Sequence, residues 1–166
     1  MTKLLTAIQR DTEQRQRSLP TNISIIEAME DERYFGSLFK DQETWNNWKV
    51  FLKAVFELEM TEAEQSTFSS FTGRQRAPSA PVSEAFAMVG RRGGKSFVSA
   101  VVACYLALFR DWRPFLAPGE TGWIFVVAAD RQQARIVLGY IKSILHLPQF
   151  VGLIDRELLL EIHLKN

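Results

Sequence analysis

Apolar residues recur at helical spacing in two stretches of the chain, and each stretch predicts a helix with one buried face. The first stretch carries them at Trp45, Trp48, Phe51, Leu52, Val55 and Phe56. The second carries them at Ala134, Val137, Leu138, Ile141, Ile144 and Leu145. Asp130 is expected to cap this second helix, because Gln133 can reach back to it, and Pro148 marks its end.

A short helix is predicted to start after Thr61 and to end near Phe71. Thr61 is followed three residues later by Glu64, the spacing at which each side chain satisfies a free backbone donor of the other residue. The segment from Gly73 to Pro81 mixes turn-forming residues with two arginines and contains two prolines, which lack a backbone donor. We expect it to be a loop that leads into a new layer of structure.

The middle of the chain has the pattern of a β–α–β unit. Phe86 to Val89 reads as a short buried strand, and Lys95 to Phe109 as a helix. Trp123 to Ala129 reads as a second strand that is apolar on both faces, as a strand between two layers of helices would be. The pattern predicts an α/β fold for this half of the chain.

The two ends of the chain are less regular. Thr2 to Arg17 is polar and compatible with a helix, and it predicts an arm that lies outside the core. Leu160 to Asn166 alternates apolar and polar residues like a half-exposed strand, and asparagine is a common first residue of a hairpin turn. We therefore expect a hairpin to begin there and the sequence to stop within a domain.

The composition fits an ordinary globular protein of 166 residues, with 46% hydrophobic and 23% charged residues. The formal net charge is +1, so any contact with nucleic acid would have to come from local patches. The single cysteine, Cys104, excludes an internal disulfide and favours a reducing, cytoplasmic setting. The longest apolar run is too short to cross a bilayer, so no membrane span is expected.

Candidate chemistry is concentrated in Met88 to Ser96, with the sequence MVGRRGGKS. In a phosphate-binding loop the backbone N–H groups surround the phosphates, a lysine neutralises the β and γ oxygens, and the adjacent hydroxyl binds magnesium. Those roles would fall to Gly93, Gly94, Lys95 and Ser96. The strict spacing requires glycine at position 89, where this chain has valine, and the alternative is a basic turn between a strand and a helix.

The loop and its surroundings resemble the large terminase subunits of tailed bacteriophages. The resemblance rests on the segment from Gly90 to Ser96, on Thr72-Gly73-Arg74 upstream and on the segment from Ala129 to Ala134 downstream. It implies the N-terminal part of a P-loop NTPase core of the additional-strand, catalytic-glutamate type, incomplete and preceded by helical segments. On this basis residues 1–33 would form an arm, 34–81 a helical subregion with its loop, and 82–166 the start of the ATPase core.

The resemblance also implies a function and roles for individual residues. The family packages double-stranded DNA into a procapsid through a portal protein, as a ring of subunits that acts with a small terminase subunit in the host cytoplasm. Its cofactors are ATP and Mg2+. Lys95 would bind the β and γ phosphates, Ser96 the metal, and Gly90, Gly93 and Gly94 would belong to the phosphate loop. Arg91 or Arg92 would contact the γ-phosphate, and Gln75 is a candidate for adenine recognition.

The sequence departs from the family where hydrolysis would be completed. The strand that ends at Asp130 is followed by Arg131, where the catalytic glutamate would stand, and the segment from Val151 to Arg156 lacks an Asp-Glu pair as well. The nuclease carboxylates are also missing, so this chain alone is expected to hydrolyse ATP poorly or not at all. We expect an N-terminal piece of a longer motor subunit.

Several alternatives stay open at this stage. Another P-loop motor that acts on nucleic acid, such as a helicase, would begin in a similar way. A non-catalytic module could use the aromatic helix from Trp45 to Phe56 to bind a portal or a small terminase subunit. Arg91 and Arg92 could contact a neighbouring subunit or DNA, or could be exposed to solvent. Arg131 and Gln132 could contact DNA or could only begin a helix.

Overall fold

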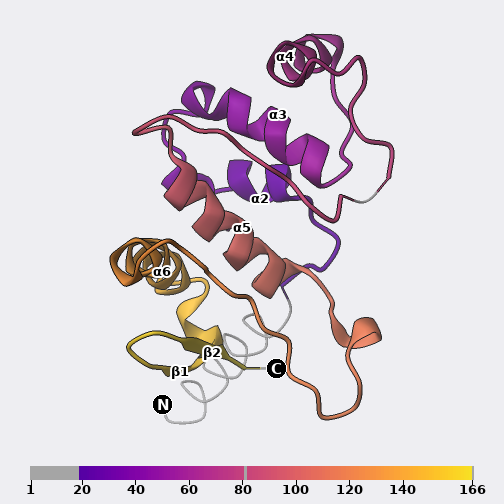
Figure 1. The fold of residues 1–166 in the computed structure, drawn as a ribbon. Coiled ribbons are helices and arrows are strands. Elements are labelled where there is room, and N and C mark those ends of the chain that lie inside the picture. Colours follow the sequence, from indigo (N-terminus) through magenta and orange to yellow (C-terminus); the bar gives the residue numbers. More distant parts are fainter. Residues whose placement is uncertain (1–18, 81, 166) are drawn as a thin grey trace, which may run out of the picture. The chain divides into compact units, whose positions relative to one another are not determined.

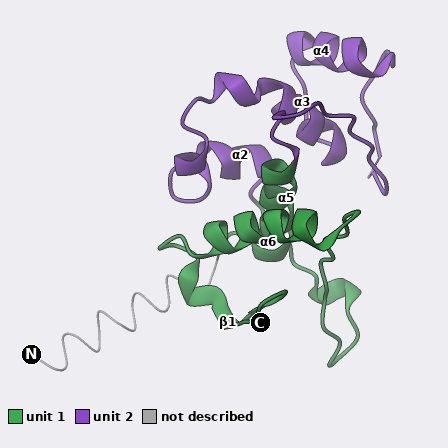
Figure 2. Cartoon of the chain, turned by 60° about the vertical axis from the view of Figure 1, so that its left-hand side comes forward, with its two compact units in different colours: residues 1–22, 96–166 green, residues 23–95 purple. Residues whose placement is uncertain are grey.

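The computed structural model describes residues 19–80 and 82–165 of the chain. The described residues belong to two compact units, which Figure 2 shows in different colours. One unit is Ile23–Lys95, and the other consists of the described residues of Met1–Asn22 and Ser96–Asn166. The arm predicted over Thr2 to Arg17 lies outside the described residues.

The Ile23–Lys95 unit is helical (Figure 1). In chain order its helices, with the two 3-10 turns marked η, are α2 (Ile25–Glu30), η1 (Gly36–Leu38), η2 (Glu43–Trp45), α3 (Asn46–Val55) and α4 (Glu62–Thr72). Ser24 caps α2 with its hydroxyl, and Glu27 returns a carboxylate to the Ser24 N–H. This helix lies inside the segment expected as an arm, and its Ala28 and Met29 are fully buried.

The apolar core between α3 and α4 forms around Val50, Ala54 and Phe68, with Met60 and Ala77 packed against it. The predicted helix is present, but of the six apolar residues expected on its buried face only Leu52 is buried. Val50, Leu52 and Ala54 are buried, whereas the aromatic residues of the predicted face are only half-buried. Two of these aromatic side chains, Trp45 and Trp48, contact the glycine-rich loop of the same unit.

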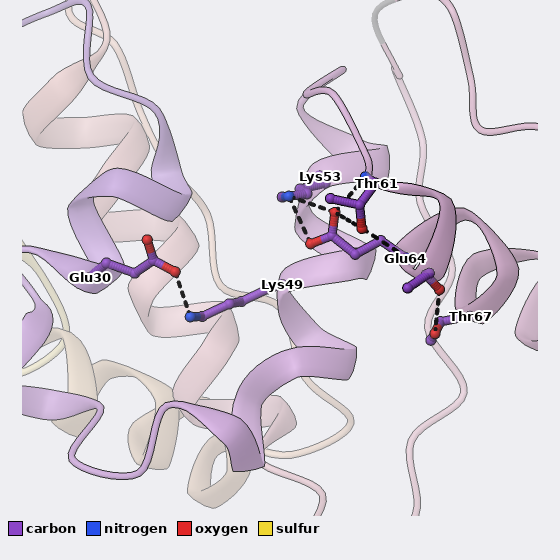
Figure 3. A network of polar contacts seen from close by, with 7 residues as sticks. Glu30, Lys49, Lys53, Thr61, Glu64 and Thr67 are labelled. Atoms are coloured by element: carbon purple, nitrogen blue, oxygen red, sulfur yellow. Dashed lines mark hydrogen bonds and ion pairs between the residues drawn. The ribbon is translucent and has the colours of Figure 1, made fainter.

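Helix α4 begins and ends as the sequence predicts. The Thr61 hydroxyl accepts a hydrogen bond from the Glu64 N–H at 3.3 Å, and the Glu64 carboxylate accepts one from the Thr61 N–H at 2.8 Å. Gly73 then ends the helix in the left-handed conformation, with a φ of 69°. Both Glu64 oxygens also bind the Lys53 ammonium of α3, at 2.7 and 2.8 Å, so the cap joins the two helices (Figure 3).

The other unit, green in Figure 2, contains two long helices and a small hairpin. Its elements are α5 (Lys95–Phe109, which starts on the last residue of the Ile23–Lys95 unit), η3 (Arg113–Phe115), α6 (Arg131–Leu145), η4 (Val151–Leu153), β1 (Ile154–Glu157) and β2 (Ile162–Leu164). The bounds predicted for the helix after the glycine-rich loop are confirmed. Asp130 caps α6 as expected: it accepts from the Gln133 N–H at 2.9 Å and from the Gln133 amide at 2.8 Å.

Helices α5 and α6 contact each other in this unit. The ring of Phe97 meets that of Tyr140 edge to face, with centroids 5.6 Å apart, and the Cys104 thiol lies 4.0 Å from the Ile141 carbonyl oxygen. Burial raises the pKa of Cys104 to about 12, so its thiol stays protonated and behaves as a small apolar core residue. Of the stripe predicted for α6, Ile144 and Leu145 are buried and the other four residues are half-buried.

The strand predicted over Leu160 to Asn166 is present as β2, but it is the second strand of its hairpin and not the first. It pairs antiparallel with β1, which precedes it in the sequence, and Ile154 lies opposite Leu164. The expected turn at Asn166 lies outside the described residues. Lys142 of α6 holds the hairpin through the Leu158 carbonyl, at 2.8 Å, and through the carboxylate of Glu157, at 2.9 Å.

The two strands expected on either side of α5 are not formed. Neither Phe86–Val89 nor Trp123–Ala129 belongs to a strand, and the sheet of the described residues contains only β1 and β2. Their apolar side chains are exposed instead of covered by helices; Phe86 is 89% exposed and Val127 is 90% exposed. Such a run has the local preference for a strand, but its N–H and C=O groups need neighbouring strands before a ladder exists.

A search of the described helices for a membrane span finds none of sufficient length and apolarity.

The ion pair between Lys53 and Glu64 makes the stability of the α3 and α4 pair depend on pH. Burial acts to raise the pKa of Glu64, but the hydrogen bonds from Lys53 and Thr61 outweigh it and lower the pKa below its usual 4.5. A lowered folded-state pKa stabilises the protein above the unfolded value, and this contribution is lost as the pH falls through the folded pKa. Glu64→Gln should therefore reduce the free energy of unfolding by about 1 kcal/mol at pH 7.

The deficit of Glu64→Gln should shrink progressively as the pH falls below 4.5, the usual pKa of the group, which urea unfolding at a series of pH values would measure. Glu62→Gln is the matched control, because Glu62 is exposed on the first turn of the same helix. A deficit that stays constant down to pH 3, or an equal one in the control, would contradict the assignment.

Candidate phosphate-binding loop

The segment from Gly90 to Lys95 forms a tight turn that leads into α5. The N–H of Gly93 donates to the carbonyl of Gly90 at 3.2 Å, which closes a four-residue turn with Arg91 and Arg92 at its centre. Arg92 has a φ of 62°, the left-handed conformation that residues with a β-carbon rarely adopt. Gly94 follows with a φ of 78°. Two of the three residues immediately before the helix thus have a positive φ.

Two tryptophans contact this turn, Trp45 just before α3 and Trp48 in its first turn. The Trp48 indole N–H donates to the Gly93 carbonyl oxygen at 2.7 Å, a contact between residues 45 positions apart in the sequence. A β-carbon added to Gly94 would lie 2.9 Å from the Trp45 ring atom Cζ3 and 3.4 Å from Trp48 Nε1. Glycine is therefore required at position 94 both by the backbone conformation and by the indole rings against it.

The tryptophans are themselves supported by edge-to-face contacts with phenylalanines. Trp45 meets the buried Phe39 with ring centroids 5.2 Å apart, and Trp48 meets Phe51 at 5.5 Å. Edge-to-face aromatic pairs of this kind contribute about 0.5–1.5 kcal/mol each beyond the area that they bury. The loop thus packs against an ordered aromatic surface of its own unit.

The bond from Trp48 determines where the next backbone donor points. In a trans peptide the C=O of one residue and the N–H of the next point in opposite directions, and none of the described peptides is cis. The Gly93 carbonyl is directed at the indole, so the Gly94 N–H is directed away from it. This N–H makes no hydrogen bond to another described residue. It is a donor available for a ligand.

The charged residues next to this donor in the sequence are all positive. Arg91, Arg92 and Lys95 are exposed, and neither arginine has an ion pair or hydrogen bond within the part of the chain that the structure describes. The first turn of α5 contains no acidic residue. The dipole at the start of this 15-residue helix adds to the same positive potential. The arrangement suits an anion with several oxygens.

The individual loop positions contribute differently. Gly93 has no room for a side chain, because a β-carbon there would lie 2.5 Å from Cγ1 of Val89, the residue that replaces the usual first glycine. Gly90 has open space around its Cα atom and no positive φ, so the conformation does not require glycine there. Ser96 is half-buried in the first turn of α5.

The donor set fits a phosphate better than a metal ion held by the protein alone. No three His, Cys, Asp or Glu side chains of residues 19–80 and 82–165 gather in a way that could hold a metal. A magnesium ion at this loop would have the Ser96 hydroxyl as its protein ligand and would take its other ligands from phosphate and water.

Two other sets of predicted residues are described by their own local contacts. Gln75 is exposed beyond α4, its carbonyl accepts from the Gln65 amide at 3.2 Å, and no hydrogen bond between described residues joins it to the loop. Arg131 and Gln132 are exposed on the first turn of α6, where Asp130 is engaged as the helix cap. The role of Gln75 in adenine recognition therefore stays a prediction.

The tryptophans are the residues of this site that the sequence reasoning missed. Their spacing of three was interpreted as part of a core face, although an indole N–H needs an acceptor when it is covered. That requirement predicts a carbonyl partner for Trp48, but nothing in the sequence indicates which of the distant carbonyls it would be.

A comparison of the chain with family models, curated proteins and solved structures finds no match.

Alanine substitutions at Gly94 and Gly73 can separate the cost of backbone strain from the cost of a collision with the indoles. Gly73 also has a positive φ, of 69°, but no atom lies near the position of its missing β-carbon. Gly73→Ala should lose about 1–2 kcal/mol from the left-handed conformation alone. Gly94→Ala should lose about 1–3 kcal/mol more, because the added methyl must displace Trp45.

The comparison is made by urea unfolding of both variants. Gly90→Ala should remain close to wild type, since its β-carbon meets open space. Equal losses at positions 94 and 73 would show that Trp45 does not pack on the loop.

Proposed function

We propose that the segment from Gly90 to Ser96 binds the phosphates of a nucleotide. The observation that carries the proposal is the Gly94 N–H, which is unpaired, directed away from Trp48 and placed at the start of α5 beside three exposed cations. Backbone donors at a helix start and a following lysine are the groups that bind polyphosphates. A basic turn with only a structural role would not require Lys95 and Ser96 after two glycines.

The nucleotide is proposed to be ATP with Mg2+, bound as part of a DNA-packaging motor of the terminase large-subunit kind. Lys95 would pair with the β and γ phosphates, Ser96 with the metal, and Arg91 or Arg92 with the γ-phosphate. Double-stranded DNA, a portal protein and a small terminase subunit would be the partners, in a homo-oligomeric ring in the host cytoplasm. This assignment is supported by the arginine-bearing loop and by the helix that follows it.

The proposed fold is an incomplete P-loop core in which the two exposed apolar segments act as strands. They precede and follow the loop and α5 in the order of a β–α–β unit. Both would need partner strands to cover their side chains, since exposed apolar runs of this kind are found at contact surfaces. Gly90 to Ser96 would then lie at the carboxyl end of the first strand, where nucleotide sites of α/β folds occur.

Binding without efficient turnover is the expected behaviour of the chain alone. The carboxylate of Asp130 is occupied in capping α6, and Arg131 follows it. Arg131 stands where the terminase family has its catalytic glutamate, and phosphoryl transfer depends on a group that orients the attacking water. Nucleotide affinity is therefore the property to measure.

The contacts of the aromatic helix favour nucleotide binding over the alternative function, in which this helix would bind a portal or a small terminase subunit. In the structure Trp45 and Trp48 contact the loop of their own unit and so are not a free docking surface. A helicase-like motor would use the same phosphate loop, and the proposal for Gly90 to Ser96 holds for it as well.

Lys95→Ala should weaken binding of ATPγS with magnesium by about ten- to a hundredfold, because a charge-assisted contact contributes about 1.5–3 kcal/mol. Isothermal titration calorimetry on the full chain would measure the affinity. Lys40→Ala is the control, since Lys40 is an exposed lysine of the same unit. Equal affinities of wild type and Lys95→Ala, or no binding by the wild type, would contradict the proposed function.

A further inference from the structure

The proposed phosphate loop depends on the orientation of the peptide group between Gly93 and Gly94. Gly93 and Gly94 are consecutive glycines, and Gly94 already has a φ of 78°. Without a β-carbon on either side, little steric hindrance opposes rotation of the peptide between them. In one orientation its N–H faces the ligand side, and in the other its carbonyl oxygen would face there and repel phosphate.

The Trp48 indole favours the first orientation. Its N–H donates to the Gly93 carbonyl at 2.7 Å, and a rotated peptide would lose that acceptor. The indole has little freedom to follow, because its ring lies edge to face against Phe51 with centroids 5.5 Å apart and because Trp48 is part of α3. On the other side the Trp45 ring fills the space next to the Gly94 Cα atom.

We propose that Trp48 is a positioning residue of the phosphate loop, which orients the peptide between Gly93 and Gly94 so that the Gly94 N–H is presented to a nucleotide phosphate. It acts through the backbone and does not touch the ligand. The inference rests on the proposed function for its ligand, but the orientation of the loop by Trp48 can be tested without any nucleotide.

The test compares two substitutions that each remove one indole donor. Trp48→Phe keeps an aromatic ring but loses the bond to Gly93. Trp112→Phe is the matched control, because the Trp112 indole N–H donates to the Leu106 carbonyl at 2.8 Å in the other unit. Both variants lose one indole-to-carbonyl hydrogen bond, and only the first acts on the loop.

Two readouts separate the inference from the proposed function. The first is the rate of tryptic cleavage after the exposed Arg91 and Arg92, without nucleotide, which should rise severalfold in Trp48→Phe and stay at the wild-type rate in Trp112→Phe. The second is the affinity for ATPγS with magnesium, which should fall by about three- to tenfold in Trp48→Phe alone, as expected for one lost hydrogen bond.

The outcomes are distinct. Wild-type binding with unchanged affinity in Trp48→Phe would overturn the inference and leave the proposed function intact. If the wild type does not bind the nucleotide, the proposed function is overturned, and so is the presentation of the Gly94 N–H to a phosphate. The cleavage rates would still decide whether Trp48 orders the loop. If Trp48→Phe does not fold, hydrogen exchange of the wild-type indole N–H replaces it: exchange as fast as that of free tryptophan would overturn the inference.

Discussion

A single hydrogen bond from the Trp48 indole to the Gly93 carbonyl sets the geometry of the proposed phosphate loop. The segment has two consecutive glycines and two positive φ angles within a few residues, so its own backbone does not select one conformation. The selection comes from α3, which supplies Trp48 and, just before its first residue, Trp45. The helical unit thus fixes the conformation of the loop that is proposed to bind phosphate.

The other contacts of that unit fix the position of α3 and so the position of the two indoles. Helix α3 positions the indoles only if it is fixed itself, and it is fixed by the core around Val50 and Phe68 and by the pair of Lys53 with Glu64 (Figure 3). The Glu64 carboxylate caps α4 and binds the lysine at once, so one side chain contributes to both helices. Lys49 adds a bond to Glu30 of α2, at 2.6 Å.

Local signals in the sequence predicted the helices and their ends well, and long-range pairing poorly. The cap at Thr61, the cap at Asp130 and the bounds of α5 depend on residues within a few positions of each other, where spacing determines the contacts. The strands at Phe86 and Trp123 depend on partners elsewhere, and apolar composition alone cannot provide them. The contact between Trp48 and Gly93 spans 45 residues, and no periodicity reports a contact of that kind.

The central claim is that the oriented loop binds nucleotide phosphates through its backbone. The most direct measurement is a two-dimensional NMR titration of the isotopically labelled chain with ATPγS and magnesium, in which each glycine amide is observed separately. We expect the Gly94 amide to shift with saturable dependence on nucleotide, together with that of Lys95, while the amides of Gly73 and Gly119 do not move. Unchanged Gly94 and Lys95 resonances at saturating nucleotide would contradict binding of phosphate by the loop.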